Sequence, residues 1–385
     1  MAPGAHRLME GRPIRLLSIV GTRPEAIKIA PIALAATGRA RIDHRILATG
    51  QHGVLFDEAL AAFGLAADER IEVAHDSCPD TYATRLKAAL VARLAQDLPD
   101  MVLVQGDTST AFAGARAAAT LGVPLGHVEA GLRSGDLADP WPEERNRIAI
   151  DRLATLLFAP SPEAAAKLAG ERCEGATIIT GNTGIDALLW MRDRLALPER
   201  GCPRRILVTC HRRESFGSGV EGICAAVLAL ADRGDVVVTF PVHTNPAVGD
   251  MVRARLADHP AIMLTSGLSY PHWVAAMASA HLILTDSGGI QEEAPALGVP
   301  TLVLRHVTER PEALATGNLR LVGTDRDAIV AAATRILDDP ADHAVMARPN
   351  FPYGKGIAAA RILHQVEEYF AKSRVNDPPL LSRPA

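Results

Sequence analysis

Short apolar segments alternate with longer amphipathic segments along almost the whole chain. The first half has apolar runs at residues 15–20, 44–49, 101–104, 124–127, 156–159 and 177–180. The second half has them at residues 205–209, 236–240, 261–264, 282–285 and 301–304. Each run has the length of a buried strand, and each is followed by a helical or loop segment. This alternation predicts parallel β-sheets that are covered by helices on both faces.

The two sets of predicted strands are separated by residues 192–203, which include the linker-like sequence Leu-Pro-Glu-Arg-Gly-Cys-Pro. With 385 residues, the chain is long enough to form two hydrophobic cores. We therefore predict an α/β protein with two Rossmann-like domains, residues 1–183 and 184–361, and a cleft between them. The amphipathic segment 356–370 predicts a last helix, and the chain from about 362 to 385 is expected to pack back on the N-terminal domain.

The segment 282–304 carries the clearest candidate for ligand binding. Its first apolar run is followed by Asp286-Ser-Gly-Gly289, a helical stretch and a second apolar run. Ser287 occupies a helix N-cap position, and Gly288 and Gly289 leave the turn without side chains, so backbone N–H groups can approach a ligand. A helix N-terminus at the carboxyl end of a strand favours anions, because its N–H groups and its dipole point at them. An ordinary βα connection has the same pattern.

Glu292 and Glu293 follow in the same predicted helix. A glutamate there can accept hydrogen bonds from the vicinal hydroxyls of a ribose while a diphosphate occupies the turn. The alternative is that both carboxylates face solvent. Arg310 comes after the next predicted strand, which puts a cation beside the proposed anion site.

Two more cations come directly after the first strand. Arg23 and Lys28 lie in the sequence Gly-Thr-Arg-Pro-Glu-Ala-Ile-Lys, with Pro24 at the start of a predicted helix. Cations beside a helix N-terminus suit a phosphate or a departing diphosphate. A solvated helix face with an ion pair to Glu25 is the alternative. Lys28 stands among apolar residues, which favours a functional role.

Two histidines follow the first two strands of the second half. His211 is flanked by Arg212 and Arg213, so it is a candidate for contacting a phosphate or acting on the leaving group. His243 lies in Pro-Val-His-Thr-Asn-Pro, where a role in the turn is about as plausible as a role in binding.

Acidic residues follow three predicted strands or loops of the first half. Asp107 comes after the strand 101–104, Glu129 after the strand 124–127, and Glu143 with Glu144 in a proline-rich loop. Acids on neighbouring loops can divide proton abstraction and donation, because burial and mutual repulsion separate their pKa values. Helix capping and helix-start positions are the alternative roles for Asp107 and for the two later glutamates. Glu129 stands between apolar residues and is therefore the first candidate for proton transfer.

Composition narrows the class of protein. The formal net charge of −4 argues against general nucleic-acid binding, and no apolar run reaches the length of a membrane span. Five scattered cysteines without a C-x-x-C pair are typical of reduced thiols in a cytoplasmic protein. The sequence has no serine elbow, zinc motif, Walker loop or G-x-G-x-x-G fingerprint. We therefore predict an enzyme for a diphosphate nucleotide that uses carboxylates and no tightly bound cofactor or metal.

Taken together, these clusters resemble the non-hydrolysing UDP-N-acetylglucosamine 2-epimerases, from about Gly21 to Tyr353. The most specific matches are Gly21–Pro31, Gly106-Asp-Thr, His127–Asp136 with Pro140–Glu144, Gly181-Asn-Thr, His211–Phe216 and Thr285–Pro295. The resemblance implies a glycosyltransferase-B-like fold, a homodimer and the interconversion of UDP-GlcNAc and UDP-ManNAc. It also implies that the C2 proton is removed and UDP leaves, which gives 2-acetamidoglucal, and that UDP then adds back with the proton on the other face.

The resemblance also assigns roles to single residues. It makes Asp107, Glu129 and Glu143 the acid/base carboxylates and puts Arg23, Lys28 and His211 around the diphosphate and the reacting sugar. It makes Ser287, Gly288 and Gly289 the phosphate turn. Of the two helix glutamates it selects Glu293 as the ribose ligand, with Arg310 as a further sugar or phosphate contact and Trp273 near the uracil.

The chain departs from the family pattern where some members bind a second, activating UDP-GlcNAc. Gln51-His52 is followed by Gly-Val-Leu-Phe in place of polar residues, and the segment 76–80 has no arginine. We therefore expect a weak or absent activator site. The alternative functions are a hydrolysing relative that releases ManNAc and UDP, a glycosyltransferase of the same fold, and a non-catalytic sugar-nucleotide sensor.

Overall fold

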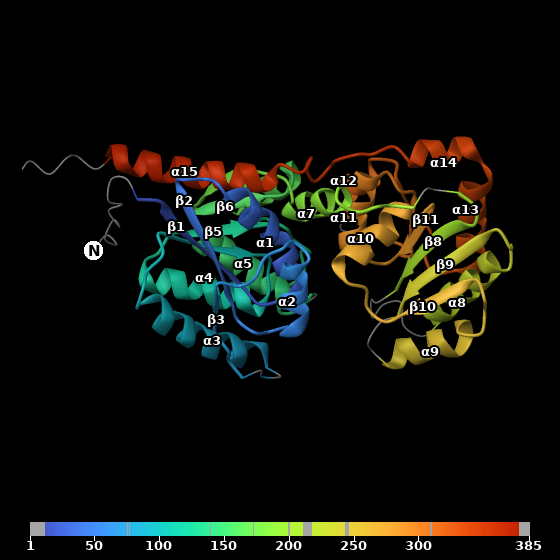
Figure 1. The fold of residues 1–385 in the computed structure, drawn as a ribbon, viewed down its shortest axis with the longest axis horizontal. Helices are drawn as coiled ribbons and strands as arrows, with labels where there is room; N and C mark the ends of the chain where they lie inside the picture. Colours follow the sequence, from blue (N-terminus) through green and yellow to red (C-terminus); the bar gives the residue numbers. More distant parts are fainter. Residues whose placement is uncertain are drawn as a thin grey trace, which may run out of the picture. The chain divides into compact units, whose positions relative to one another are not determined.

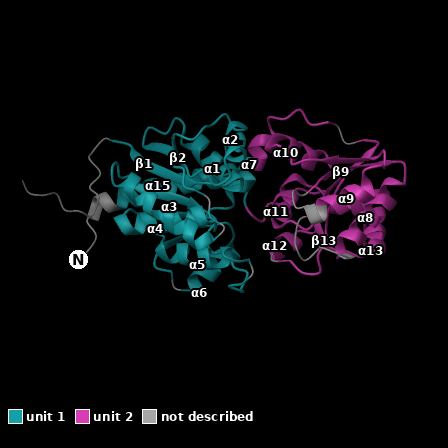
Figure 2. Ribbon diagram, turned by 90° about the horizontal axis from the view of Figure 1, so that it is seen from below, with its two compact units in different colours: residues 1–187, 354–385 teal, residues 188–353 magenta. Residues whose placement is uncertain are grey.

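The computed structural model describes residues 12–74, 76, 78–138, 140–171, 173–198, 201–210, 218–242, 246–308 and 310–376. It divides into two compact units (Figures 1 and 2). Unit 1 comprises the chain up to residue 187 and from residue 354 on, and unit 2 comprises residues 188–353.

Unit 1 contains a parallel sheet with the strand order β3-β2-β1-β4-β5-β6-β7. Its strands are β1 (Ile14–Val20), β2 (Ile42–Ala48), β3 (Glu69–Arg70), β4 (Met101–Gln105), β5 (Leu125–Val128), β6 (Leu156–Ala159) and β7 (Ala176–Ile179). The chain runs outward in one direction from β1 to β3 and in the other from β4 to β7. The loops after β1 and β4 therefore lie at the switch point of the sheet, where ligands bind in open α/β folds.

The helices of unit 1 cover the two faces of this sheet, as right-handed crossovers require (Figure 1). They are α1 (Arg23–Ala36), α2 (Val54–Ala61), α3 (Pro79–Leu94), α4 (Ser109–Leu121), α5 (Glu143–Leu153), α6 (Pro162–Gly170), α7 (Thr183–Arg192, which continues into unit 2) and α15 (Ala358–Asn376). The alanine-rich face of α4 packs closely on the sheet, since a Cβ on Gly114 would lie 3.1 Å from Cγ1 of Val104. This close packing holds the loop after β4 against the strands.

Unit 2 contains a parallel sheet with the order β10-β9-β8-β11-β12-β13. Its strands are β8 (Arg204–Thr209), β9 (Val236–Pro241), β10 (Ile262–Thr265), β11 (Leu282–Thr285), β12 (Thr301–Val303) and β13 (Leu319–Leu321). Its helices are α8 (Ser218–Ala231), α9 (Pro246–Leu256), α10 (Tyr270–Ser279), α11 (Gly288–Leu297), α12 (Pro311–Leu314), α13 (Arg326–Asp338) and α14 (Pro340–Met346). The switch point lies between β8 and β11, so the turn before α11 begins there.

The predicted fold class, two Rossmann-like α/β halves, is confirmed. Each predicted strand is present within two residues of its predicted start and end, while β3 and β13 were missed. The last helix, predicted over 356–370, spans Ala358–Asn376 and contacts α1 of unit 1. The predicted domain limits at 183/184 and 361 stay predictions, and residues 377–385 lie outside the described part of the chain.

Candidate active site

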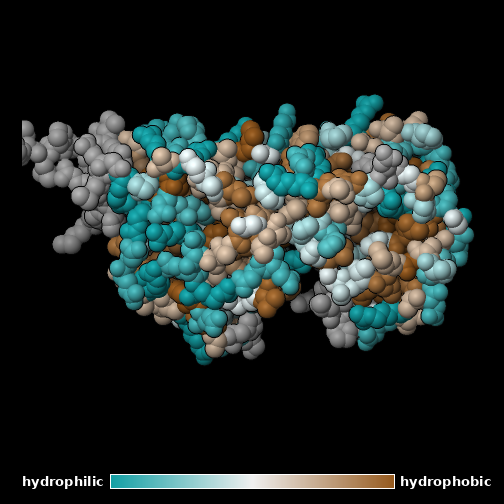
Figure 3. All heavy atoms as spheres, in the orientation of Figure 1, coloured by the Kyte–Doolittle hydropathy of each residue, from teal (hydrophilic) through white to brown (hydrophobic). Residues whose placement is uncertain are grey.

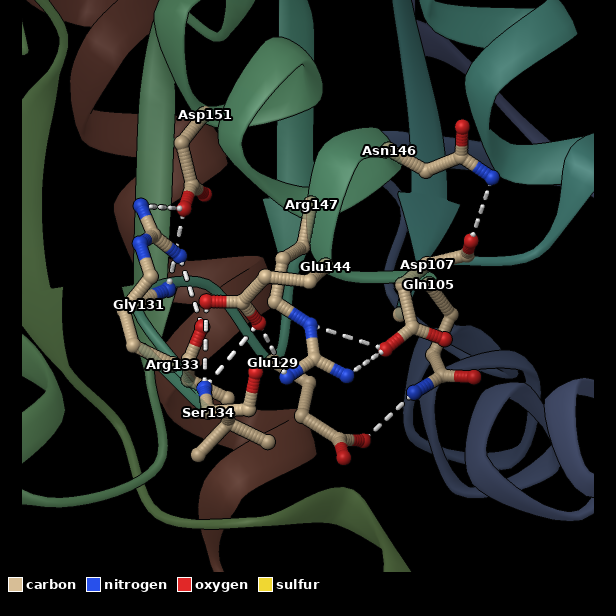
Figure 4. Close-up of polar contacts among 12 residues, drawn as sticks. Gln105, Asp107, Glu129, Gly131, Arg133, Ser134, Glu144, Asn146, Arg147 and Asp151 are labelled. Atoms are coloured by element: carbon tan, nitrogen blue, oxygen red, sulfur yellow. Dashed lines mark hydrogen bonds and ion pairs between the residues drawn. The ribbon is translucent and has the colours of Figure 1, made fainter. Parts of the chain in front are cut away.

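Glu129 lies at the centre of the polar cluster on unit 1, directly after β5 (Figure 4). Its carboxylate accepts a hydrogen bond of 2.5 Å from Nε2 of Gln105 and forms an ion pair with the ammonium of Lys28. The side chain is 11% exposed and that of Lys28 is 24% exposed. A cation and an amide donor thus bind the carboxylate of Glu129 in a mostly buried position, which makes it a candidate for proton transfer.

The backbone of Glu129 is also unusual. Its φ of 72° lies in the left-handed region, and among the described residues it is the only non-glycine with a positive φ. The N–H groups of Glu129 and Ala130 both donate to the carbonyl of Phe158 at 3.1 Å, which holds this conformation. Left-handed backbone at a non-glycine residue is typical of functional sites, where the surrounding structure stabilises it.

Asp107 lies at the end of the neighbouring strand β4. The N-cap of α4 is Thr108, whose side chain accepts from the N–H of Ala111, so Asp107 does not serve as the cap. The guanidinium of Arg147 instead binds Asp107, with Nε at 3.0 Å from Oδ2, and Asn146 donates to the backbone carbonyl of Asp107 at 2.9 Å. Asp107 is therefore a partly exposed carboxyl group held by two residues of α5.

Glu143 and Glu144 have different surroundings although they are adjacent. Glu144 is 1% exposed and accepts hydrogen bonds from the N–H of Ser134 and of Gly135 and from Nη1 of Arg147. It therefore fixes the loop after β5. Glu143 is the first residue of α5 and is half-buried, which leaves it as the candidate for chemistry.

Arg23 and Lys28 both lie on α1, which follows β1. Arg23 is its first residue, and Thr22 is the N-cap in a capping box with Glu25. Glu25 is buried and accepts from the N–H of Thr22 at 2.7 Å and from Oγ1 of Thr108 at 2.6 Å. Burial raises the pKa of Glu25, while these hydrogen bonds oppose the rise. Glu25 therefore ties the loop after β1 to the loop after β4, and it is not the partner of a solvated cation.

In unit 2, Ser287 is the N-cap of α11, as predicted, but its side chain makes no cap hydrogen bond. Its own N–H donates to Oγ1 of Thr285 at 3.0 Å, and this hydroxyl lies 2.7 Å from Oγ1 of Thr209. By contrast α1, α4, α6 and α13 each have a side-chain cap. The first N–H groups of α11, at Gly288 and Gly289, therefore belong to a helix start that lacks a serine cap.

Glu292 and Glu293 also differ. Glu292 is buried and accepts a hydrogen bond of 2.5 Å from Nε of Arg310, whereas Glu293 is half-buried. Gln291 holds the same region, because it donates to the carbonyl of Ser287 at 3.1 Å and accepts from Oγ1 of Thr308. Arg310 is thus joined to α11 beside the turn. Trp273, half-buried, lies on α10.

His211 and His243 lie outside the described residues. Arg147, Gln105, Gln291 and Thr285 were not among the predicted site residues. Arg147 has a sequence signal, since it stands one helical turn after Glu143 in a segment that begins a helix. Among the described residues, no three His, Cys, Asp or Glu side chains are grouped closely enough to hold a metal ion.

Known proteins match this chain over most of its length. The family model for UDP-N-acetylglucosamine 2-epimerase matches residues 34–367. UDP-N-acetylglucosamine 2-epimerase of Salmonella typhimurium is 42% identical over 372 residues, which are 92% of this chain and 99% of that protein. The chain belongs to the UDP-N-acetylglucosamine 2-epimerase family.

Solved structures of the family agree with the fold. UDP-GlcNAc 2-epimerase from Neisseria meningitidis, bound to UDP-GlcNAc, has a TM-score of 0.83 and 36% identity, over 92% of this chain and all of that one. S. aureus MnaA with UDP has a TM-score of 0.83 and 37% identity, over 94% of this chain and 98% of that one. The predicted resemblance to an epimerase family and the glycosyltransferase-B-like class are therefore confirmed.

Three further observations concern the hydrophobicity of the helices, one face of the surface and the cysteines. No helix in the described part of the chain is long and apolar enough to cross a membrane, and on the face shown in Figure 3 hydrophobic residues are scattered among hydrophilic ones. None of the five cysteines, all within the described ranges, forms a disulfide.

Proposed function

We propose that this protein interconverts UDP-GlcNAc and UDP-ManNAc by elimination and re-addition of UDP. The observation that carries the proposal is the pair of carboxylates Glu129 and Asp107, which follow the adjacent strands β5 and β4 beside the switch point of unit 1 and are each bound by a cation. Family membership supports the substrate, because a family structure is described as bound to UDP-GlcNAc.

In this mechanism a carboxylate takes the proton from C2, and the electron pair of the C–H bond forms the C1=C2 double bond. The bond between C1 and the diphosphate oxygen breaks, and UDP leaves with its electron pair. For the return step, the diphosphate oxygen attacks C1 and a carboxylic acid delivers a proton to the opposite face of C2. The net reaction inverts C2 without a change of oxidation state.

Glu129 is the first candidate for the base because Lys28 and Gln105 bind its carboxylate in a mostly buried position. Asp107 and Glu143 are the candidates for the complementary acid. Arg147 would position the carboxyl group of Asp107 for this exchange, since its guanidinium binds Asp107 directly.

We assign the binding of UDP mainly to unit 2. The α11 N-terminus with Ser287, Gly288 and Gly289 would hold the diphosphate, Glu293 the ribose and Trp273 the uracil side. Because Glu292 is buried and bound to Arg310, whereas Glu293 is half-buried and more accessible, we favour Glu293 of the two glutamates for hydroxyl groups. Arg310, Arg23 and Lys28 would contact phosphate or sugar. The roles of His211 at the leaving group and of His243 in binding stay predictions.

Incubation with UDP-GlcNAc in D₂O, followed by NMR, separates the alternatives. Deuterium at C2 of intact UDP-GlcNAc and UDP-ManNAc is expected. Free ManNAc with UDP would instead indicate a hydrolysing enzyme. An unchanged substrate that gives up its sugar only when an acceptor is added would indicate a glycosyltransferase, and binding without any turnover would indicate a sensor.

We further propose that the activating UDP-GlcNAc site is weak or absent. At the start of α2, where many relatives carry polar residues, Val54 and Leu55 are 71% and 50% exposed and offer no hydrogen-bonding side chains. In the segment 76–80, the second place where the chain departs from the family pattern, Asp80 forms an ion pair with Arg145. Pure UDP-ManNAc should therefore be converted without added UDP-GlcNAc, and a strict requirement for UDP-GlcNAc would contradict this proposal.

The homodimer implied by the resemblance is also proposed, for a cytoplasmic enzyme. A groove on unit 1 is lined by the apolar Phe112, Ala119, Ala149 and Leu153 and by the polar Lys87, Arg116, Thr120 and Arg152, and Leu153 is 40% exposed. Burial of these apolar side chains against a second copy would be favourable. Light scattering after size exclusion should give twice the mass of one chain, and the mass of one chain would refute the homodimer.

A further inference from the structure

His127 lies on β5, two residues before Glu129, and its side chain is completely buried. The ring bridges two other elements of unit 1. Nδ1 lies 2.6 Å from Oδ1 of Asp151 on α5, and Nε2 lies 2.8 Å from the backbone carbonyl of Gly106, the residue before Asp107. One ring thus joins the loop that carries Asp107 to the strand that carries Glu129.

The two partners determine the protons on this ring. A backbone carbonyl only accepts hydrogen bonds, so Nε2 must carry a proton. Burial favours the neutral form of Asp151, but the charges and hydrogen bonds of His127 and Arg133 outweigh it and hold the pKa of Asp151 below its ordinary value. An ionised Asp151 also only accepts, so the contact at Nδ1 calls for a donor as well. Both ring nitrogens of His127 thus face groups that accept hydrogen bonds.

Asp151 extends the connection to the loop after β5. Its Oδ2 accepts from the N–H of Gly131 at 3.2 Å and from Nη2 of Arg133 at 2.7 Å (Figure 4). Arg133 is held in turn by Glu171, with Nε at 2.6 Å from Oε1. Both carboxylate oxygens of the buried Asp151 are thereby in contact with this loop or with His127.

The same helix holds the partner of Asp107. Arg147, which binds Asp107, lies one turn before Asp151 on α5. The His127–Asp151 pair therefore links the three elements that carry Asp107, Glu129 and Arg147. A displacement of any one of them would change the separation between the two carboxylates, and the chemistry depends on that separation.

We propose that His127 and Asp151 are positioning residues, which fix Asp107 and Glu129 relative to each other, and that the His127 ring does so as an imidazolium that donates from both nitrogens, to Asp151 and to the Gly106 carbonyl. This inference rests on the proposed epimerisation for its kinetic consequences. The hydrogen-bonded bridge itself is independent of the proposed epimerisation, because it concerns only the protons and contacts of the protein without substrate.

Two substitutions separate the two hydrogen bonds of the ring. The amide nitrogen of glutamine reaches the place of Nε2, and that of asparagine reaches the place of Nδ1. His127→Gln therefore keeps the donor to Gly106 and loses the donor to Asp151, while His127→Asn does the reverse. Both replace a buried cation with a neutral amide, so they are matched in charge.

Turnover of UDP-GlcNAc is measured for both variants at a temperature where circular dichroism shows them folded. We expect kcat to fall by about 100-fold in His127→Asn, because a small misplacement of a reacting group has that effect. In His127→Gln we expect a fall of about 10-fold or less, with the KM for UDP-GlcNAc within about threefold of wild type in both. Equal losses of kcat, or a greater loss in His127→Gln, would overturn the positioning role.

A second measurement does not depend on activity. In wild-type protein labelled with ¹⁵N-histidine, both ring nitrogens of His127 should resonate in the protonated range near neutral pH, with the signal assigned by its loss in His127→Gln. A neutral tautomer, with one unprotonated nitrogen, would overturn the imidazolium bridge. If wild type incorporates no deuterium at C2 while the bridge is observed, the proposed function fails and the structural assignment stands.

Discussion

At the scale of single residues, neighbouring positions with the same chemistry have different tasks. Thr108 caps α4, which leaves the adjacent Asp107 for its ion pair with Arg147. Glu144 accepts hydrogen bonds from backbone N–H groups of the loop after β5, whereas Glu143 is only half-buried. The substitution of one such neighbour therefore says little about the other.

The residue on which the proposed chemistry depends most is Glu129. We predict that Glu129→Gln abolishes deuterium exchange at C2 and lowers kcat by at least about 100-fold, since an amide cannot take the proton. The variant should fold, because glutamine keeps an oxygen that can accept from Lys28 and Gln105. Exchange in D₂O measured by NMR is the test.

Glu163→Gln is the matched control for Glu129→Gln. Glu163 is an exposed acid in the first turn of α6, so its change should leave exchange and kcat within about twofold of wild type. Exchange that persists in folded Glu129→Gln would remove Glu129 from proton transfer and leave Asp107 or Glu143 as the base.

The sequence identified Asp107, Glu129 and the turn before α11, because polar residues after apolar runs mark the carboxyl ends of strands. The sequence did not identify His127, Asp151 or Arg147 as their partners. Contacts between residues 106, 127 and 151 arise only when strands β4 and β5 pair and α5 packs beside them. Local pattern contains no information about such a buried network.

At the scale of elements, local sequence likewise predicts long strands better than short ones. Strands of four or more residues contain apolar runs that the sequence predicts, and so does β12, whose three residues lie in the apolar segment 301–304. β3, with two residues, and β13, with three, have no periodicity to detect and form because a neighbouring strand offers free edge groups. The start of α15 likewise depends on a tertiary contact.

That contact is a carboxylate cap. Asp186 on α7 accepts from the N–H of Ala358 at 3.2 Å and of Ala359 at 2.9 Å, which are the first residues of α15. Burial raises the pKa of Asp186 to about 6, despite these hydrogen bonds. The protonated side chain is thus favoured in the folded state, so its contribution to stability is complete below the unfolded pKa of 3.8 and is lost as pH rises through about 6.

We predict that Asp186→Asn removes this pH dependence. Relative to wild type, the free energy of unfolding of the variant should improve by about 2 kcal/mol between pH 4.5 and pH 7, on top of a pH-independent offset from the altered cap. Urea unfolding at both pH values, with Asp193→Asn on the exposed end of the same segment as control, measures the difference. An identical difference at the two pH values would refute the prediction.

At the scale of the whole molecule, the two units have the same arrangement of strands but different functional groups at the carboxyl ends of those strands. In each sheet the first strand lies inside, the next two extend to one side and the remaining strands to the other. The switch point of unit 1 carries carboxylates with cations bound to them. The switch point of unit 2 carries a glycine turn at a helix N-terminus, which suits a negatively charged leaving group.

This division predicts that binding of UDP and proton transfer can be impaired separately. Gly289 is exposed and is the second residue of α11, and a Cβ there would meet only Oγ of Ser287, at 3.9 Å. An aspartate at this position would be accommodated, and it should stabilise the helix by about 0.3–1 kcal/mol through the helix dipole. The same carboxylate would repel the diphosphate, so Gly289→Asp should lose UDP affinity by at least about 10-fold.

Calorimetric titration with UDP and thermal unfolding together test Gly289→Asp. Gly289→Ala is the control for steric effects and should keep UDP affinity within about threefold, because its methyl group adds no charge. Glu129→Gln should bind UDP like wild type, since its change lies in unit 1. The expected result, a more stable protein that binds UDP more weakly, cannot come from misfolding. Undiminished UDP binding by Gly289→Asp would show that the anion site lies elsewhere, and the assignment of the diphosphate to α11 would then be wrong.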